Sequence, residues 1–368
     1  MKRAILAMVP AVGILLAACG STSNTPASSP AAGFTIPTPP AANLIGAGST
    51  FDYPFFNAAF YAYNQKFSDV TVNYQSIGSG GGIQQLTKKT VDFGASDVPL
   101  KTSEADAMGG ADAVVQIPVT LGAVSLAYNL QGVGNGQLKL TPDLIAGIFL
   151  GSITTWNDPA ITAVNSGLSL PSQPINVVHR SDASGTTYIF TDYLSNVSPE
   201  WKTKIGVGKS VSWKTGGGQK GNEAVAAYIK QTPGAIGYVE LAYVVQTNMT
   251  QARLKNADGN FVLPSAAGAT AAAAAKPNVT PTDFSIVNAP GKDSAPIAGY
   301  SWAMLYKDQT DKTKGQATVD LLYWLISPDG QQYAANLNYA KLPDNIAKAD
   351  VATLKTVTSG GTALLTVS

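Results

Sequence analysis

The sequence contains one cysteine and one histidine among its 368 residues. A disulfide within the chain needs two cysteines, so none can form. The same scarcity argues against a zinc cage or a histidine-rich metal site, and we expect neither a metal nor a cofactor. Charged residues make up only 13% of the chain, and the formal net charge is +1. Because no arginine-rich tract interleaved with aromatic residues is present, we expect no nucleic-acid partner.

The N-terminal segment has the pattern of a bacterial export signal. Two basic residues are followed by an apolar stretch from Ala4 to Ala18 and then by Cys19. This order predicts a lipoprotein signal peptide over residues 1–18, with Cys19 as the lipidated first residue of the mature protein. A plain signal peptide that happens to precede a cysteine is the alternative. The lipid would hold the protein on the extracytoplasmic face of the cell membrane.

The next segment differs in composition from the rest of the chain. Residues 19–43 are rich in serine, threonine, proline and alanine and lack apolar periodicity. This composition is typical of a flexible tether. We therefore expect the folded body to start near Leu44.

From Leu44 onward, short strand-like runs alternate with amphipathic helical runs. Val70–Tyr74 and Ile236–Val239 are of the first kind, and Phe55–Phe67 and Lys312–Ile326 are of the second. Such alternation predicts α/β layers. The length and the 45% hydrophobic content suit two domains, each with its own core.

A dense polar turn, residues 179–187, follows a strand-like stretch and precedes a helical one. Backbone N–H groups at a helix start have no intrahelical acceptor, so such a turn can hold an oxyanion. Ser184 and Thr186 add hydroxyls, Gly185 allows a close backbone approach, and Arg180 adds a planar fork that matches phosphate oxygens. An ordinary helix cap, with Arg180 in a surface pair with a neighbouring aspartate, is the alternative.

Three further segments have similar chemistry. Residues 46–51 and 77–82 are glycine-rich and precede helical runs, and residues 92–97 end in Asp97. One such turn is a weak signal, because glycine-rich turns also serve plain connectivity. Four in one chain, together with Arg180, form a more specific set.

These turns, in this order, resemble the substrate-binding proteins of the bacterial phosphate-specific ABC importers. The matching segments are GAGSTF at 46–51, YQSIGSGGG at 74–82, VDFGASD at 91–97, RSDASGT at 180–186, GAIGY at 234–238 and NYAKLP at 338–343. The resemblance implies that the protein binds inorganic phosphate as a monomer and hands it to the permease and ATPase subunits of an importer.

The resemblance also implies the architecture. It is an α/β fold of the type II periplasmic-binding-protein class, with two domains that each have a central mixed sheet flanked by helices. Residues 44–120 and 300–368 would form the first domain and residues 121–299 the second. The ligand would lie in the cleft between them, and the chain would cross near residues 117–124 and 296–302.

Carried over by position, the resemblance implies a set of phosphate ligands. The donors would be Thr50, Phe51, Ser79, Arg180, Ser184, Gly185 and Thr186, and the one acceptor would be Asp97. Two positions depart from the family: Gly80 stands where many members have serine, and Ser181 where alanine is frequent. Neither departure removes an expected ligand.

Two aspartates receive different roles. Phosphate near neutral pH carries a proton and sulfate does not, so the Asp97 carboxylate would accept a hydrogen bond from phosphate and repel sulfate. Asp182 would hold the Arg180 side chain and offset its charge. For His179 we expect no catalytic role but a partly buried ring bonded to a neighbouring carbonyl.

Other functions remain open from the sequence. A phosphate-ester hydrolase could use Ser184 or Thr186 as nucleophile, although Ser184 lies in no G-x-S-x-G motif and no metal set supports it. The same cradle could bind another oxyanion such as sulfate. A surface adhesin or signalling lipoprotein would bind no anion. We expect a binding protein without catalytic residues.

Overall fold

The computed structural model describes residues 34–367, and these belong almost entirely to one compact unit that starts at Thr35. The predicted signal peptide, Cys19 and the first part of the predicted tether lie outside the described residues. Residues 34–41 have no regular secondary structure, and the first strand starts at Ala42. The folded body thus begins two residues earlier than Leu44.

Within residues 34–367, nine strands form one mixed sheet. The path through the sheet is β2-β1-β3-β12-β4-β8-β6-β7, and β9 pairs with β4 beside it. The strands are β1 (Ala42–Gly48), β2 (Val70–Ser76), β3 (Phe93–Ser96), β4 (Val114–Tyr128), β6 (Asn176–Arg180), β7 (Gly217–Gln219), β8 (Ala235–Glu240), β9 (Thr250–Gln251) and β12 (Ala298–Tyr306).

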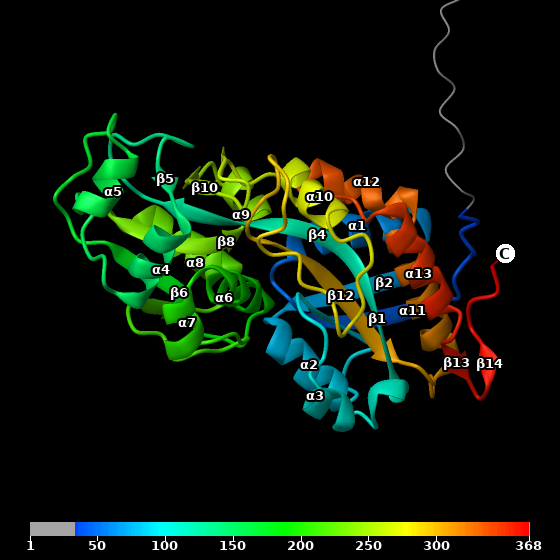
Figure 1. The fold of residues 1–368 in the computed structure, drawn as a ribbon. Coiled ribbons are helices and arrows are strands. Elements are labelled where there is room, and N and C mark those ends of the chain that lie inside the picture. Colours follow the sequence, from blue (N-terminus) through cyan, green and yellow to red (C-terminus); the bar gives the residue numbers. More distant parts are fainter. Residues whose placement is uncertain (1–33, 368) are drawn as a thin grey trace, which may run out of the picture. The chain divides into compact units, whose positions relative to one another are not determined.

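Strand β4 runs through both halves of this sheet and connects them, as Figure 1 shows. Its residues 114–123 pair with β12, and its residues 124–128 pair with β8, antiparallel in both cases. On one side lie the parallel pairs of β1 with β2 and β3, and on the other the parallel pairs of β6 with β7 and β8. One strand of 15 residues thus belongs to both halves of the sheet.

Helices cover the sheet on both sides of β4. Helix α1 packs on β2, α2 on β1 and β3, α11 on β1, and α8 on β6 and β8. The helices are α1 (Tyr53–Lys66), α2 (Ser79–Thr87), α3 (Thr102–Asp106), α4 (Pro142–Leu150), α5 (Pro159–Val164), α6 (Gly185–Val197), α7 (Pro199–Lys204), α8 (Gly221–Gln231), α9 (Leu241–Gln246), α10 (Ala266–Ala274), α11 (Lys312–Ile326), α12 (Pro328–Asn336) and α13 (Asp344–Leu354). The α/β fold of alternating strands and helices is confirmed.

Smaller elements complete the described residues. A three-stranded sheet contains β5 (Lys139–Leu140), β10 (Arg253–Lys255) and β11 (Phe261–Val262), and a hairpin contains β13 (Thr358–Ser359) and β14 (Thr362–Ala363). Across residues 34–367, each helix is too short or too polar to cross a membrane. The predicted division into residues 44–120 with 300–368 and residues 121–299 stays a prediction.

Local sequence explains where the helices near the future site begin. Ser184 caps α6, and its Oγ accepts a hydrogen bond from the Thr187 N–H at 3.1 Å. Pro54 occupies the first turn of α1, where a missing N–H costs nothing. Helix α2 begins directly after Gly78, whose φ of 87° lies in the left-handed region. The strands before α1 and α2 run toward the middle of β4 from one half of the sheet, and the strand before α6 runs toward it from the other half, so their ends face each other.

Gly48, the last residue of β1, is held in a conformation that glycine favours. Its φ is 146°, and an added Cβ would overlap the Ala95 carbonyl oxygen. The same carbonyl accepts the Ser49 N–H at 2.9 Å, so the close approach is part of the turn.

We expect Gly48→Ala to lower the free energy of unfolding by about 2 kcal/mol or more, because backbone must shift to relieve the overlap. Gly167→Ala is the matched control, since a Cβ at that position meets no atom within 4 Å. Denaturant unfolding of both variants is the measurement, and equal stabilities would contradict the expected overlap.

Candidate anion site

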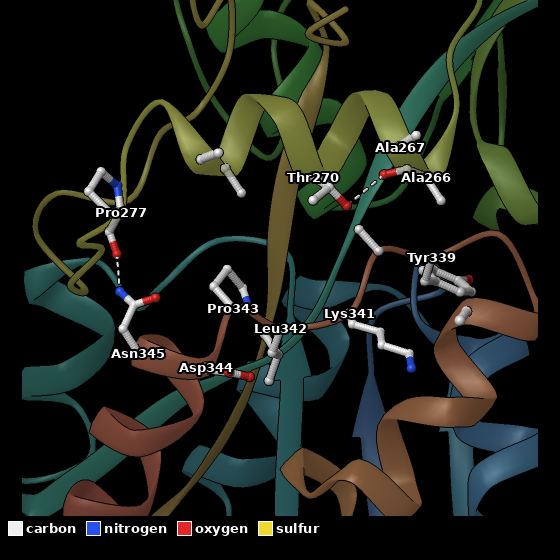
Figure 2. Close-up of a pocket in the computed structure, with 14 residues that line it drawn as sticks. Ala266, Ala267, Thr270, Pro277, Tyr339, Lys341, Leu342, Pro343, Asp344 and Asn345 are labelled. Carbon is white, nitrogen blue, oxygen red and sulfur yellow. Dashed lines mark hydrogen bonds between the residues drawn. The ribbon is translucent and has the colours of Figure 1, made fainter. Parts of the chain in front are cut away.

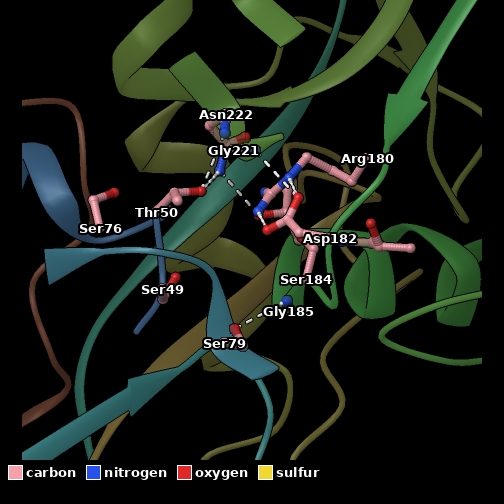
Figure 3. Close-up of polar contacts among 12 residues, drawn as sticks. Ser49, Thr50, Ser76, Ser79, Arg180, Asp182, Ser184, Gly185, Gly221 and Asn222 are labelled. Carbon is pink, nitrogen blue, oxygen red and sulfur yellow. Dashed lines mark hydrogen bonds and ion pairs between the residues drawn. The ribbon is translucent and has the colours of Figure 1, made fainter. Parts of the chain in front are cut away.

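The polar turns that the sequence singles out meet at one place in the structure. The starts of α2, α6 and α8 and the turn before α1 converge there, and Figure 3 shows their side chains pointing toward one another. The residues are buried: Thr50, Ser79, Asp97, Arg180 and Ser184 expose 3% of their surface or less. Helix starts supply free N–H groups and the positive ends of helix dipoles, so their convergence favours an anion.

Arg180, at the end of β6, is fixed by Asp182. Its Nε donates to Asp182 Oδ1 at 2.7 Å and its Nη2 to Asp182 Oδ2 at 2.5 Å, which is a two-pronged ion pair. The Gly221 N–H donates to the same carboxylate at 3.1 Å. Burial raises the pKa of Asp182, but the bonds and charge of Arg180 outweigh it and lower the pKa overall. The predicted pairing of the two side chains is therefore present.

The remaining guanidinium nitrogen of Arg180 has a different environment. Arg180 Nη1 is buried and has no hydrogen-bond partner among the described residues. The backbone N–H of Arg180 donates to the Tyr238 hydroxyl at 2.9 Å, which fixes the end of the strand. A buried charged donor without an acceptor is costly, and an anion would satisfy it.

Ser79 connects two parts of the chain that are far apart in sequence. Its Oγ accepts the Gly185 N–H at 3.0 Å and lies 3.4 Å from the Asp97 nitrogen. An added Cβ on Gly185 would lie 2.5 Å from the Asp97 Cβ, so glycine is needed for α6 to come this close. Gly80 is explained in the same way, because a Cβ there would lie 2.5 Å from the Ala183 Cβ.

Asn222, in the first turn of α8, is a residue that the sequence reasoning missed. Its N–H and its Nδ2 both donate to Thr50 Oγ1, at 3.1 and 2.9 Å. Its Nδ2 also donates to Thr186 Oγ1 at 3.1 Å, and its Oδ1 accepts the Glu240 N–H. Asn222 thereby holds the hydroxyls of Thr50 and Thr186 side by side. Because the Thr50 oxygen accepts both bonds from Asn222, the Thr50 hydroxyl proton stays available to donate to a ligand.

Asp97 is the one carboxylate at the centre of the cluster. Ser49 Oγ donates to its Oδ1 at 2.5 Å, Ser301 Oγ lies 2.9 Å from the same oxygen, and Thr186 Oγ1 lies 3.4 Å from Oδ2. Burial raises the pKa of Asp97 to about 6, although the Ser49 and Ser301 hydroxyls and the Arg180 charge lower it. The carboxyl is therefore mostly ionised at pH 7 and mostly protonated below about pH 6.

Three of the expected backbone donors have other partners in this structure, and the Gly185 N–H, bonded to Ser79 Oγ, is one of them. The Phe51 N–H donates to Ser49 Oγ at 2.9 Å, and the Ser184 N–H donates to the Lys209 carbonyl at 2.9 Å. Phe51 and Ser184 nevertheless adjoin the cluster, next to Thr50 and Gly185 respectively. The assignment of either residue as an anion ligand stays a prediction.

His179 lies beside the site but is turned away from its hydroxyls. Its Nδ1 is 3.0 Å from the Arg180 carbonyl oxygen, and its ring stacks on Trp213 with centroids 4.6 Å apart. Burial lowers its pKa. The prediction of a partly buried ring satisfied by a neighbouring carbonyl is confirmed.

Sequence signals existed for only some of the missed residues. Ser49 lies inside the segment 46–51 already singled out, so its position pointed to it. Asn222 follows a glycine-rich turn at a helix start, which is the same kind of signal as the other turns. Ser301 lies within an apolar strand, and no local pattern marks it.

A larger hollow lies elsewhere, between α10 and the segment that enters α13 (Figure 2). Its volume is about 650 Å³, and alanine, proline and leucine side chains make up most of its wall. Its lining shares no residue with the anion site. Helix α10 is rich in alanine, and its residues Ala269 and Ala272 are buried.

Comparison with known proteins gives a consistent result. A family model described as a PBP superfamily domain matches residues 29–329. The phosphate-binding protein PstS of Xylella fastidiosa strain Temecula1 is 45% identical over 319 residues, which cover 84% of this chain and 86% of that protein. The phosphate-binding protein PstS of Pasteurella multocida is 42% identical and covers 87% of this chain and 92% of its own length.

A solved structure supports the fold. The periplasmic phosphate-binding protein PfluDING, determined with bound phosphate, superposes with a TM-score of 0.69 over 84% of this chain and 93% of its own. Its sequence identity is 21%, so this likeness concerns the fold. The two-domain α/β architecture of periplasmic binding proteins is therefore the fold of this chain.

Proposed function

Because this chain belongs to the PstS family of phosphate-binding proteins within the PBP superfamily, we propose that it binds inorganic phosphate and delivers it to an ABC importer. The permease and ATPase subunits of that importer would be its protein partners, and it would act as a monomer. The relatives are phosphate-binding proteins by name, and the residues of the cluster match this role.

The observation that carries the proposal is the unpaired Nη1 of Arg180 in the same buried cluster as Asp97, whose pKa the Arg180 charge lowers. A guanidinium donor and one acceptor at the same place suit an anion that still carries a proton. Further donors are available in the cluster from the hydroxyls of Thr50, Ser79, Ser184 and Thr186. Backbone N–H groups of Phe51 and Gly185 would complete the set.

Charge is nearly balanced in this arrangement. Arg180 contributes one positive charge, and Asp182 and Asp97 contribute one negative charge each. The affinity for an anion must therefore come from hydrogen bonds and local dipoles rather than from net charge. Binding of this kind depends on exact geometry, because every donor must reach an oxygen.

Bonds between the two predicted domains support a cleft that closes over its ligand. Asn222 bonds to Thr50, and Lys209 Nζ donates to both carboxylate oxygens of Glu104, at 2.5 and 2.8 Å. Only β4 and β12 would carry the chain between the predicted domains, so a rotation there would open the site. The structure would then correspond to the closed state.

We assign no catalytic residue. The Oγ of Ser184 accepts the Thr187 N–H as a helix cap, and His179 bonds to a backbone carbonyl. Among the described residues, no basic side chain forms a hydrogen bond with Ser184 Oγ. The hydrolase alternative would require turnover of a phosphate ester that is lost in Ser184→Ala.

Titration calorimetry of the purified protein with phosphate and with sulfate is the direct test. We expect tight phosphate binding and sulfate affinity lower by about a thousandfold, because sulfate has no proton to donate to Asp97. Asp97→Asn should weaken phosphate binding by about tenfold or more and reduce the preference, since the amide can also donate. Selective sulfate binding, or no heat with either anion, would overturn the proposal.

The preference should also depend on pH. As the pH falls through about 6, Asp97 gains a proton, loses its negative charge and can itself donate to sulfate. We expect the ratio of phosphate to sulfate affinity to fall by about tenfold between pH 7.5 and pH 5. In Asp97→Asn the ratio should not change with pH, and a pH-independent ratio in the unaltered protein would contradict the role of Asp97.

We also propose that residues 1–18 direct export and that a lipid on Cys19 anchors the protein to the outer face of the cell membrane. The support is the sequence pattern around the only cysteine. Expression of Cys19→Ser in a bacterial host should leave the protein without lipid, and cell fractionation should find it outside the membrane fraction. A membrane-bound Cys19→Ser protein would contradict the anchor.

A further inference from the structure

A second buried carboxyl lies directly behind the anion site. Asp52, just before α1, has no exposed surface, and its Oδ2 lies 2.6 Å from Ser301 Oγ. Its Oδ1 is 3.3 Å from the Tyr74 hydroxyl, which donates over a shorter distance, 2.8 Å, to the Ser49 carbonyl. The anion site described above does not use Asp52.

Ser301 bridges the two carboxyls. Its Oγ is 2.6 Å from Asp52 and 2.9 Å from Asp97 Oδ1, and it has no exposed surface. Ser301 pairs with Thr120 of β4 and the next residue, Trp302, pairs with Pro118, so Val119 of β4 is the extra residue of a bulge beside Ser301. Such a bulge increases the local twist of the strands at this position.

One hydroxyl proton cannot serve two carboxylates. If Asp52 and Asp97 were both ionised, one of the two short oxygen contacts of Ser301 would have no proton in it. Two buried negative charges would also lie next to each other without a free cation, because Arg180 is already paired with Asp182. One carboxyl of the pair must therefore be protonated.

The surroundings decide which carboxyl holds the proton. Asp97 has Ser49 as a second short donor and lies near the Arg180 charge, whereas Asp52 has, besides Ser301, the long contact from Tyr74 and its own backbone N–H. The other titratable groups facing Asp52 and Asp97 are Tyr74, Tyr243 and Tyr339, whose raised pKa values keep them neutral, and Glu240, whose pKa burial raises. Burial and the Asp97 charge raise the pKa of Asp52 well above its usual value.

We propose that Asp52 is a neutral carboxylic acid that donates its proton to Ser301, so that Ser301 in turn donates to Asp97 and holds it as an ionised acceptor. In this chain Asp52 acts as a positioning residue for ligand selection, an inference that rests on the proposed function. The hydrogen bonds run from Asp52 through Ser301 to Asp97, and no proton is transferred along them. The Asp52 proton fixes the direction of the Ser301 hydroxyl, and thereby the state of the carboxylate that faces the ligand.

Carboxyl carbon NMR of the full protein with labelled aspartate tests the first half of the proposal without any ligand. We expect Asp52 to be protonated and Asp97 ionised at pH 7, with assignment from Asp52→Asn and Asp97→Asn. An ionised Asp52 at pH 7 would overturn the proposal. Because no phosphate is present, the result stands even where phosphate binding itself is not found.

Binding measurements test the second half. Ser301→Ala removes the link, and we expect phosphate affinity to fall by about tenfold and the Asp97 titration midpoint to rise by about one pH unit. Ser301→Thr, which keeps the hydroxyl, should restore most of both. Unchanged affinity and midpoint in Ser301→Ala would overturn the relay.

Asp52 variants separate a proton donor from a charge. Asp52→Leu removes the donor and should raise the pH midpoint of the Asp97 titration. Asp52→Asn can still donate to Ser301, so its midpoint should equal that of the unaltered protein. If Asp52→Asn instead lowers the midpoint below that of the unaltered protein, Asp52 carries a charge and the proposal fails. Asp329→Asn, which removes an exposed carboxylate paired with Lys66, is the matched control.

Discussion

The arrangement of the site depends on keeping one carboxylate ionised inside the protein and next to a bound anion. A buried charge of this kind is costly unless hydrogen bonds compensate it. The nearby cation, Arg180, is already matched by Asp182, so small hydroxyl side chains must supply the compensation. This requirement explains why Ser49, Ser301 and Thr186 surround Asp97 within a largely apolar interior.

Close approach of separate chain segments is the second requirement. Donors from the turn before α1 and from the starts of α2, α6 and α8 can converge only where no side chain keeps the backbones apart. Gly80 and Gly185 meet this condition, since a Cβ at either would lie 2.5 Å from a carbon of the facing segment. Glycine is therefore part of the binding geometry and not only of the turns.

The sequence predicted much of this arrangement but not all of it. Helix α11 has the bounds that its pattern indicated, and the expected ligands adjoin one buried cluster. The residues that hold the cluster together were harder to find, because Ser301 and Asp52 act through tertiary contacts that leave no local pattern. Ser301 stands beside a bulge at Val119 of β4, and this pairing joins positions nearly two hundred residues apart.

The position of β12 between β3 and β4 has a consequence for how the chain folds. Residues 42–123 are synthesised first, yet their strands cannot form a continuous sheet until residues 298–306 follow. The intervening segment, which supplies β6, β7 and β8, forms its parallel pairs from residues much closer in sequence. Pairing of distant strands is slow because the loop must close before the contacts form. The N-terminal part of the body must therefore wait, incomplete, for most of the chain to emerge.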